Sequence, residues 1–388
     1  MANVRLTSRT LRQIDSPIGV GYALLDERRG NRPLLDLAQA APTYPAAPEV
    51  IEHVVAVARD PHGGDYVQLR GLPRLRDAFA AEIAQDYQGL IGPDHVLITA
   101  GGNQAFCLVA SALAEPGDEV ILALPYYFNH DMWLRLDGIR PVYLEPGPDL
   151  VPTAAAAAEL ITTRTRAIVL VSPGNPTGVT IAPAGIAEFA DLARSRGIAL
   201  ILDETYRSFR ETDEPAHALF ADKRWPRTVV SLHSFSKDLA IPGYRVGAVV
   251  AAPALLREAT KLLDCVAICA PRIGQEAAWA GLVHAGRWRR ARAGELSRKR
   301  SRFAAAMAGR PGGFELLAVG GFFGWLRHPF PDRATADVVR ELAVEHDALT
   351  IPGTAFLPDD RGTIRVSFSN VDEAALTDFA DRLVAAGA

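Results

Sequence analysis

The sequence has few cysteines, no excess of basic residues and no long apolar run, and each shortage disfavours a class of protein. Its three cysteines form an odd number, and none stands at the spacing from nearby histidines that zinc sites use. We therefore expect Cys107, Cys265 and Cys269 to be reduced thiols of the core, and we expect no metal site.

Membranes and nucleic acids are disfavoured as partners. No stretch approaches the roughly 20 apolar residues that cross a bilayer, and the N-terminal residues lack the apolar segment of a secretory signal. The 45 Asp and Glu residues outnumber the 41 Lys and Arg residues, so the net charge of -4 gives no overall attraction for a polyanion. We expect a cytoplasmic protein that acts on small molecules.

One segment is rich in basic residues and contains a single acid, Glu295. Aromatic residues, which sites for single-stranded nucleic acid place among basic ones, are nearly absent from it. The pattern favours a solvated helix face over a nucleic-acid site for the run that contains Trp288, Arg289, Arg290, Arg292, Arg298, Lys299, Arg300 and Arg302.

From about residue 94 onward, short apolar runs alternate with helical stretches. Continuous hydrophobicity is typical of strands that are buried on both faces, and helical spacers indicate parallel crossovers. The sequence therefore predicts an α/β fold with a mostly parallel, doubly wound sheet, in which ligands lie at the carboxyl ends of the strands. The predicted strands are residues 95–99, 119–124, 166–171, 198–202, 228–231 and 246–250.

The 388 residues exceed what one hydrophobic core usually covers, so we expect two domains. Residues 48–284 should form a large α/β domain, in which the alanine-rich stretch 154–158 is a helix. A smaller α+β domain should combine residues 285–388 with an N-terminal arm, residues 1–47. Its predicted strands are residues 322–326, 348–351 and 363–369.

A lysine, Lys237, closely follows one of the predicted strands. Ser234 and Ser236 precede it, and Arg245 follows eight positions later between two glycines. Hydroxyl donors and a forked cation are what a phosphate group needs. Alone, Lys237 would be a surface lysine and Arg245 a salt-bridge residue. The phosphate-site interpretation therefore depends on these residues and the two serines occurring together.

Three further clusters also follow predicted strands. Asp203 and Tyr206 offer a carboxylate and a phenol, which suit a pyridine ring, although Asp203 could merely cap a helix. Asn175 lies in a rigid Pro- and Gly-rich turn, residues 172–178, with an extended or cis bond before Pro176. Gly102 and Asn103 lie between a strand and a helix that we expect to begin near Gln104, where backbone N–H groups can hold an anion.

Together these segments resemble the class I and II aminotransferase family, fold type I of the enzymes that use pyridoxal 5'-phosphate (PLP), over nearly the whole chain. The order and spacing of the Asn-Pro-Thr-Gly turn, the Asp-x-x-Tyr pair, the Ser-x-Ser-Lys loop and the Gly-x-Arg-x-Gly sequel carry the resemblance. The family's early Tyr-x-x-x-x-Gly-Leu motif matches Tyr66, Gly71 and Leu72, and its late Arg-x-Ser-Phe strand begins at Arg365.

The resemblance implies PLP as the cofactor and a role for each matching residue. Lys237 is implied as the covalent attachment point and proton carrier, with Asp203 on the ring nitrogen and Tyr206 and Asn175 on the ring oxygen. The phosphate contacts fall to Gly102, Asn103, Ser234, Ser236 and Arg245, and the ring packs on Tyr127. Tyr66 is implied to reach the phosphate of a neighbouring subunit, hence a homodimer with shared sites. The substrate carboxylate falls to Arg365, with Asn175 and Ala40 beside it.

Some positions depart from the family pattern or stay open. Ala40 stands where the family has glycine, which puts its backbone contact with substrate in question. His130 is either a helix-start residue or part of the substrate pocket. Arg272 is either a second cation for a dicarboxylate substrate or a structural salt-bridge residue. An aromatic cluster suits a bulky apolar substrate side chain or belongs to the core: Tyr126, Tyr127, Phe128 and Trp133.

The resemblance implies a PLP-dependent aminotransferase that moves an amino group from an L-amino acid to a 2-oxo acid. The implied mechanism is ping-pong and passes through pyridoxamine phosphate. A PLP-dependent β-lyase, or another enzyme that makes the same substrate carbanion, remains the alternative, because the motifs do not separate these reactions. A non-catalytic sensor in a transcriptional regulator is disfavoured, because too few residues precede the α/β region to form a DNA-binding domain.

Overall fold

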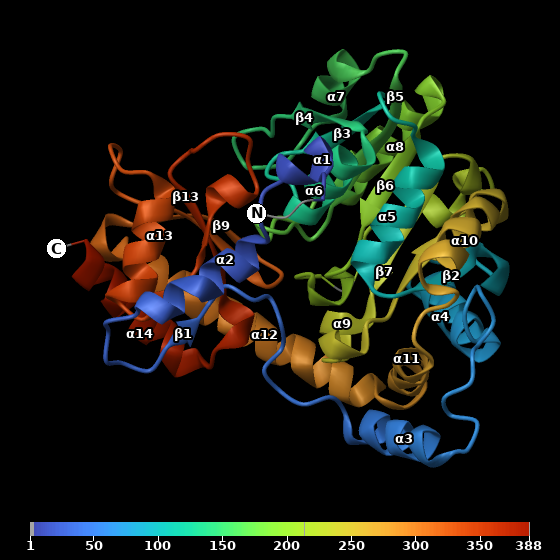
Figure 1. Cartoon of the computed structure of the whole chain (residues 1–388), viewed down its shortest axis with the longest axis horizontal. Coiled ribbons are helices and arrows are strands. Elements are labelled where there is room, and N and C mark those ends of the chain that lie inside the picture. Colours follow the sequence, from blue (N-terminus) through green and yellow to red (C-terminus); the bar gives the residue numbers. More distant parts are fainter. Residues whose placement is uncertain (1–3, 213, 388) are drawn as a thin grey trace.

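A seven-stranded sheet forms the centre of the larger part of the molecule in this computed structural model, which describes residues 4–212 and 214–387 (Figure 1). Its strand order is β2-β8-β7-β6-β5-β3-β4. β8 runs antiparallel to both of its neighbours, β2 and β7, and the other strand pairs recorded in this sheet are parallel, so the predicted α/β fold with a mostly parallel sheet is confirmed. The strands are β2 (Val96–Thr99), β3 (Glu119–Ala123), β4 (Arg140–Leu144), β5 (Thr165–Val171), β6 (Ala199–Asp203), β7 (Val229–Ser234) and β8 (Gly247–Val250).

All six predicted strands of this sheet are present, and the prediction omitted β4. β4 pairs with β3 alone and lies at the edge of the sheet. Its sequence, Arg-Pro-Val-Tyr-Leu, is only partly buried, because an edge strand needs no continuous apolar run. The continuous apolar run that predicted the other strands is therefore weak in β4.

Helices cover both faces of the sheet, as the doubly wound fold requires. One face packs Leu75, Phe79 and Phe189 from α4 and α8, and the other packs Phe106 and Leu256 from α5 and α10. The predicted alanine-rich helix is α7. The bounds are α3 (Pro48–Arg59), α4 (Pro73–Asp86), α5 (Gly102–Leu113), α6 (Phe128–Asp137), α7 (Ala154–Leu160), α8 (Pro183–Arg196), α9 (Phe235–Asp238), α10 (Pro253–Ala267) and α11 (Arg272–His284).

A smaller antiparallel sheet of order β12-β13-β10-β9 forms the second part of the molecule. The predicted strands correspond to β10, β11, β12 and β13, while β9 and the short β1 were not predicted. β1 pairs with β11 in parallel. The bounds are β1 (Leu35–Asp36), β9 (Glu315–Gly320), β10 (Phe323–Arg327), β11 (Ala348–Leu349), β12 (Ile351–Pro352), β13 (Thr363–Ser367), α13 (Thr335–Val344) and α14 (Glu373–Ala386).

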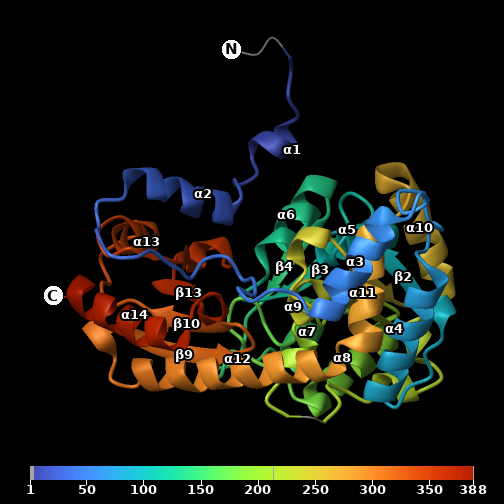
Figure 2. The ribbon, with the colours of Figure 1, turned by 90° about the horizontal axis from the view of Figure 1, so that it is seen from below.

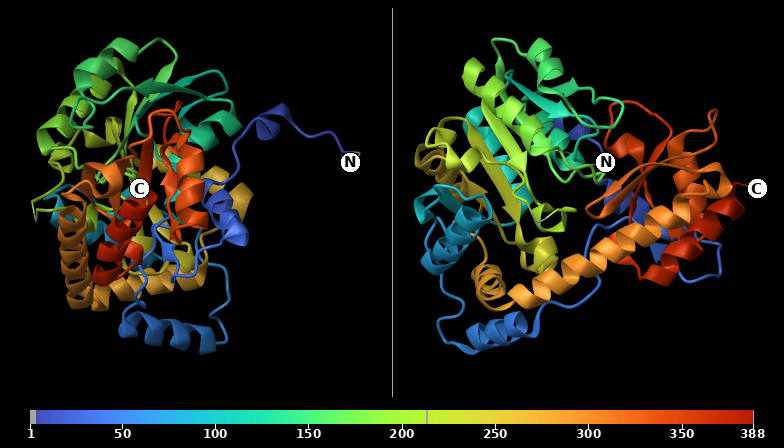
Figure 3. Two further views of the ribbon diagram at one scale, coloured as in Figure 1. Left: turned by 90° about the vertical axis from the view of Figure 1, so that its left-hand side faces the viewer. Right: turned by 180° about the vertical axis from the view of Figure 1, so that it is seen from behind.

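The long helix α12 (Gly286–Met307) runs from the larger sheet region to the smaller one (Figures 2 and 3). The N-terminal chain contributes to both regions, because α2 (Pro17–Ala23) contacts β12 and α3 packs on α11. The short α1 (Ser8–Leu11) projects beyond α2 in Figure 2. The division into residues 48–284 and residues 1–47 with 285–388 stays a prediction.

Two sequence expectations are wrong. Cys265 is exposed and Cys107 and Cys269 are partly exposed, so the cysteines are not all core thiols. The basic residues of α12 do not form one solvated face, because carboxylates elsewhere in the fold pair with several of them. Lys299 is buried, and the side chains of Arg289 and Arg300 are each only 16% exposed. Among the described residues, no helix has both the length and the apolar character to cross a membrane.

Candidate active site

A cavity of about 360 Å³ gathers residues from the carboxyl ends of the large sheet, from the N-terminal chain and from β13. All but one of the predicted site residues line it. Tyr66 does not, and its side chain is exposed. The predicted residues in the cavity wall are Ala40, Gly102, Asn103, Tyr127, Asn175, Asp203, Tyr206, Ser234, Ser236, Lys237, Arg245 and Arg365.

Lys237 enters the cavity from α9, the single helical turn that directly follows β7. The hydroxyl of Ser234 accepts a hydrogen bond from the Ser236 N–H at 3.2 Å and caps this turn. The Lys237 ammonium donates to the carbonyl oxygen of Ala40. Burial, together with the charges of Arg245 and Arg365, lowers the pKa of Lys237 to about 8. A neutral amine is therefore accessible near physiological pH.

Asp203 is the last residue of β6 and has two partners. One carboxylate oxygen accepts from the Thr205 N–H at 3.0 Å, and the other lies 3.3 Å from Nε2 of His130. Burial alone would raise the pKa of Asp203, but His130 and the Thr205 bonds outweigh it and the pKa is lowered. The site thus keeps a carboxylate ion within the cavity.

His130 lies in the first turn of α6, as one of its two interpretations had it, and it does not line the cavity. Its contact with Asp203 was not predicted. The ring is buried and stacks on Phe106 with centroids 3.9 Å apart. Only the tertiary fold shows this contact, because 73 positions of sequence separate the histidine from its carboxylate partner.

Two phenols line the same cavity. Tyr127 donates to the side-chain oxygen of Asn103 at 3.2 Å, and Tyr206 packs between Phe322 and Phe323. Burial raises the pKa of Tyr127 to about 12 and raises the pKa of Tyr206 as well. Both phenols therefore stay protonated and can donate hydrogen bonds.

The start of α5 and Arg245 form one side of the cavity that suits an anion. Arg245 lies 3.4 Å from the hydroxyl of Ser236 and donates to the Pro242 carbonyl at 2.9 Å. Gly101, which caps α5, has a φ of 88°, and a Cβ there would lie 2.3 Å from the Arg245 guanidinium. Glycine is thus required at Gly101, both for the backbone conformation and for the close approach of the cation. The free N–H groups of α5 add partial positive charge.

Arg365 reaches the cavity from β13 and is almost completely buried. It donates to the side-chain oxygen of Asn175 at 3.0 Å and to the carbonyl of Ala38, and its guanidinium lies 4.9 Å from the Phe356 ring centre. Burial lowers the pKa of Arg365 to about 10. The turn that presents Asn175 has its cis bond at Ser172–Pro173, rather than before Pro176.

Several residues that were considered for the substrate pocket lie elsewhere. Arg272 donates to the carbonyl of His62 at 2.6 Å and lies 3.8 Å from Glu276, as its structural interpretation had it. Tyr126 stacks on Tyr143, and Trp133 donates to Ser111, so both lie outside the cavity wall. Sequence reasoning missed Ile18, Gln39, Val171, Thr205 and Pro242; of these, only Thr205, between Asp203 and Tyr206, carried a signal.

The cavity has more positive than negative charge. Lys237, Arg245 and Arg365 line it, and none of the three has a carboxylate partner among the described residues, whereas Asp203 is its only acidic residue there. An anionic ligand is needed to balance these charges. PLP, with its phosphate and its pyridinium, fits the set, because Asp203 suits the ring nitrogen and Arg245 suits the phosphate, which leaves a cation for the carboxylate of a second ligand.

Fold and site together define an enzyme of the PLP-dependent, fold type I class. The comparison with protein families gives the particular one: residues 32–383 match the model of aminotransferase class I and II, so the chain belongs to this family and is an aminotransferase. The aspartate aminotransferase of Thermus thermophilus with maleate has the same fold, with a TM-score of 0.89 at 23% identity over 99% of this chain and 100% of that one.

Related sequences carry several activities in their names. The aromatic aminotransferase ISS1 of Arabidopsis thaliana is 29% identical over 90% of this chain and 88% of its own length. The valine–pyruvate aminotransferase of Mycobacterium tuberculosis is 33% identical over 67% of this chain and 66% of its own length. These names cover different substrate side chains, so they support the reaction class and leave the substrate to be argued from the cavity.

Proposed function

We propose that the protein transfers the amino group of an L-amino acid to a 2-oxo acid in ping-pong order, with PLP bound in the cavity of Lys237. The observation that supports this most directly is the surplus of cations, Lys237, Arg245 and Arg365, around a single carboxylate. When bound, PLP supplies a ring that takes up the electron pair left on the substrate Cα after its proton leaves.

In this proposal the cofactor is held by groups that the fold already orients. Arg245, the serine hydroxyls and the first N–H groups of α5, at Gly102 and Asn103, bind the phosphate. Asp203 holds the proton on the ring nitrogen, and His130 keeps the carboxylate ionised. Tyr206 and Asn175 contact the ring oxygen, and Tyr127 packs on the ring.

Lys237 is the proposed proton carrier. Because its pKa is lowered to about 8, roughly a tenth of the free amine is neutral at pH 7 and can accept the Cα proton. With PLP bound, the Lys237 ammonium that results would be the group placed to give the proton back. Arg365 binds the substrate carboxylate with its forked guanidinium, and Asn175 fixes the orientation of that fork at 3.0 Å.

The substrate side chain is proposed to be apolar or aromatic. Ile18 of α2 and Phe128 of α6 bring apolar surface to the cavity wall, next to Tyr127. Among the described residues, each cation that lines the cavity already has a proposed role with the phosphate, the Cα proton or the α-carboxylate. A dicarboxylate substrate would need one more cation.

We also propose a homodimer in which Tyr66 reaches the phosphate of the neighbouring site. Tyr66 is 78% exposed, which is unusual for a tyrosine. Further large apolar side chains are exposed on α3 and at the end of α10: Ile51, Val55, Val266 and Ile268. A monomer would leave this surface in water, and a symmetric dimer would cover it. A cytoplasmic location belongs to the same proposal.

The test is a screen of amino donors with purified protein and added PLP. We expect visible absorbance from the lysine-bound cofactor, lost on addition of a competent amino acid and restored by a 2-oxo acid. Leucine, phenylalanine and aspartate are the donors to compare, and the first two should react faster. Release of ammonia and pyruvate from a β-substituted alanine without restoration by a 2-oxo acid contradicts transamination and supports a β-lyase.

A further inference from the structure

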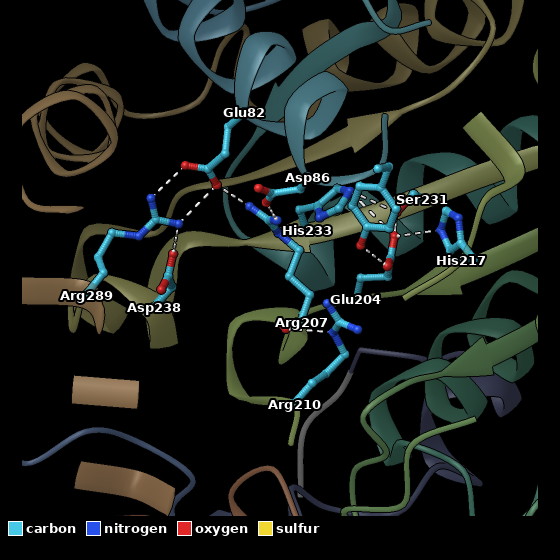
Figure 4. A network of polar contacts seen from close by, with 11 residues as sticks. Glu82, Asp86, Glu204, Arg207, Arg210, His217, Ser231, His233, Asp238 and Arg289 are labelled. Atoms are coloured by element: carbon cyan, nitrogen blue, oxygen red, sulfur yellow. Dashed lines mark hydrogen bonds and ion pairs between the residues drawn. The ribbon is translucent and has the colours of Figure 1, made fainter. Parts of the chain in front are cut away.

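A cluster of ion pairs outside the cavity joins four separate elements of the fold (Figure 4). Its centre is Glu82 of α4. One guanidinium, that of Arg289 on α12, donates to both carboxylate oxygens at 2.6 and 3.0 Å. A second, that of Arg207 at the start of η3 (Arg207–Phe209), also donates to Glu82 and further contacts Asp86.

The cluster is connected to the cavity through the chain itself. Arg207 directly follows Tyr206, and Asp238 directly follows Lys237. Asp238 lies 2.5 Å from the guanidinium of Arg289. Glu82 therefore joins two series of contacts. One runs through Arg207 to the neighbouring Tyr206. The other runs through Arg289 and Asp238 to Lys237, which the proposed function assigns to the cofactor. Figure 4 shows the Glu82 carboxylate between the two guanidinium groups.

The cluster is mostly shielded from water and remains charged. The side chains of Glu82, Arg207, Arg289 and Asp238 are 17, 12, 16 and 11% exposed. Burial alone would raise the pKa of Glu82, but Arg207 and Arg289 outweigh it and lower the pKa to about 2. Shielded pairs of this kind are costly to break, because the remaining partner keeps an uncompensated charge.

The elements that the cluster holds are too short to fix their own position. α9, which carries Lys237, has four residues, and η3, which follows Tyr206, has three. Helices of one turn are unstable alone, so tertiary contacts must set their place. Proton transfer is sensitive to displacements of about 1 Å, so such contacts matter for the reaction as well as for the fold.

We propose that Glu82 is a positioning residue for the reaction, which holds Lys237 and Tyr206 in place by joining the Arg289–Asp238 pair to Arg207. The inference rests on the proposed function for the roles of Lys237 and Tyr206. Glu82 is not among the residues that line the cavity, and in this proposal it acts through its two arginines. Glutamine at this position would present an N–H₂ group toward one guanidinium, so the bridge would be lost while the side-chain volume is kept.

The test uses Glu82→Gln with a matched control, Glu119→Gln. Glu119 is also a buried carboxylate held by two arginines, Arg140 and Arg164, but it lies at the amino end of β3. The first readout is the pH dependence with which a small amine-reactive reagent modifies Lys237 in cofactor-free protein. The extent of modification is measured by peptide mass spectrometry. The second is the dissociation constant of PLP.

We expect Glu82→Gln to raise the apparent pKa of Lys237 toward its ordinary value, because a displaced α9 admits water. PLP binding should weaken about tenfold, and Glu119→Gln should change neither readout. Unchanged Lys237 titration and PLP binding in Glu82→Gln, with a loss of thermal stability equal to that of the control, overturn the inference.

A second variant covers the case that Glu82→Gln does not fold. Asp238→Asn removes the Asp238–Arg289 contact beside Lys237 and leaves the Glu82–Arg207 contact intact. Asp86→Asn instead removes a partner of Arg207 whose side chain is 45% exposed. Asp238→Asn should shift the Lys237 titration and Asp86→Asn should not; equal titrations contradict the inference. If wild-type protein fails to bind PLP, the proposed function fails, while the Lys237 titration still tests the role of Glu82.

Discussion

The two ends of the seven-stranded sheet treat buried charge in opposite ways. At the amino end, Glu119 accepts hydrogen bonds from Thr162 at 2.6 Å, Arg164 at 3.0 Å and Arg140 at 3.3 Å. Both arginines are more than half exposed, so water solvates whatever charge the carboxylate leaves unbalanced. At the carboxyl end, Arg365 is 1% exposed and has no carboxylate partner among the described residues.

The difference distinguishes an end whose buried charge stabilises the fold from an end whose buried charges suit an anionic ligand. The bonds from Thr162 and the arginines lower the pKa of Glu119, so its ionised form favours the fold. Burial lowers the pKa of Lys237 and of Arg365, so their charged forms oppose it. The buried cations are electrostatically unfavourable without a ligand, and a bound anion relieves this cost and so binds more tightly. Removal of these charges should therefore harm function more than stability.

The largest expected effect is on turnover in Lys237→Ala. Loss of a positioned proton carrier should lower the rate of amino transfer about 10⁴-fold, because general base catalysis contributes up to that factor. The control is Lys261→Ala, which removes an exposed lysine of α10 paired with Glu258. Rates of the first half-reaction are measured by stopped flow. Wild-type turnover in Lys237→Ala would contradict the proposed catalytic role of Lys237, and with it the role of the carboxyl end of the sheet.

Arg365→Met comes next and tests both halves of the comparison. Loss of a forked contact with the substrate carboxylate should cost about 3 kcal/mol, or roughly 100-fold in kcat/KM. The melting temperature of the cofactor-free protein should rise, because a buried unpaired cation is replaced by an apolar chain. Arg361→Met, which removes an arginine paired with Glu145 on the surface, is the control and should keep full activity. A fall in melting temperature together with unchanged kcat/KM contradicts the comparison.

A third effect is the pH dependence of stability in cofactor-free protein. Lys237 has a pKa of about 8 in the fold and about 10.5 when unfolded, so between these values the unfolded chain binds more protons. The free-energy cost of burying the charged lysine is close to its full value below pH 8. As this cost is lost, the stability of the fold should rise by about 2 kcal/mol from pH 7 to pH 10. Urea unfolding of wild type is compared with Lys237→Met, which should lack this rise. Parallel pH profiles contradict the lowered pKa.

Much of the site could be predicted because its residues lie in local motifs at strand ends. The Ser-x-Ser-Lys loop and the Asp-x-x-Tyr pair each combine a strand end with groups of matching chemistry, and parallel strands bring their ends to one edge. Asp203 and Lys237 could therefore be assigned to one cavity without any contact being known. The same holds for the central strands, whose continuous apolar runs follow from burial on both faces.

The contacts that were not predicted join distant parts of the chain. His130 was considered without its contact to Asp203, and Glu82 was not considered; each lies on a helix far along the chain from its partners. The basic run of α12 was misassigned for the same reason, because the carboxylate partners of Arg289 are Glu82 and Asp238 on other elements. Pairing between distant charges depends on packing, which periodicity in one segment does not report.

The smallest effect on activity is expected for Glu119→Gln, and it completes the comparison. An amide in place of the carboxylate weakens the bonds from Thr162, Arg140 and Arg164 and should lower stability by about 2 kcal/mol. Because the pKa of Glu119 is lowered, the stability it contributes is present at neutral pH and is lost as the pH falls below about 4. The variant should therefore approach wild type in acid, while its kcat/KM at pH 7 equals that of wild type. Urea unfolding at pH 7 and pH 3 measures the first result, and steady-state kinetics the second. A loss of activity as large as that of Arg365→Met would mean that the two ends of the sheet are coupled rather than divided between stability and binding.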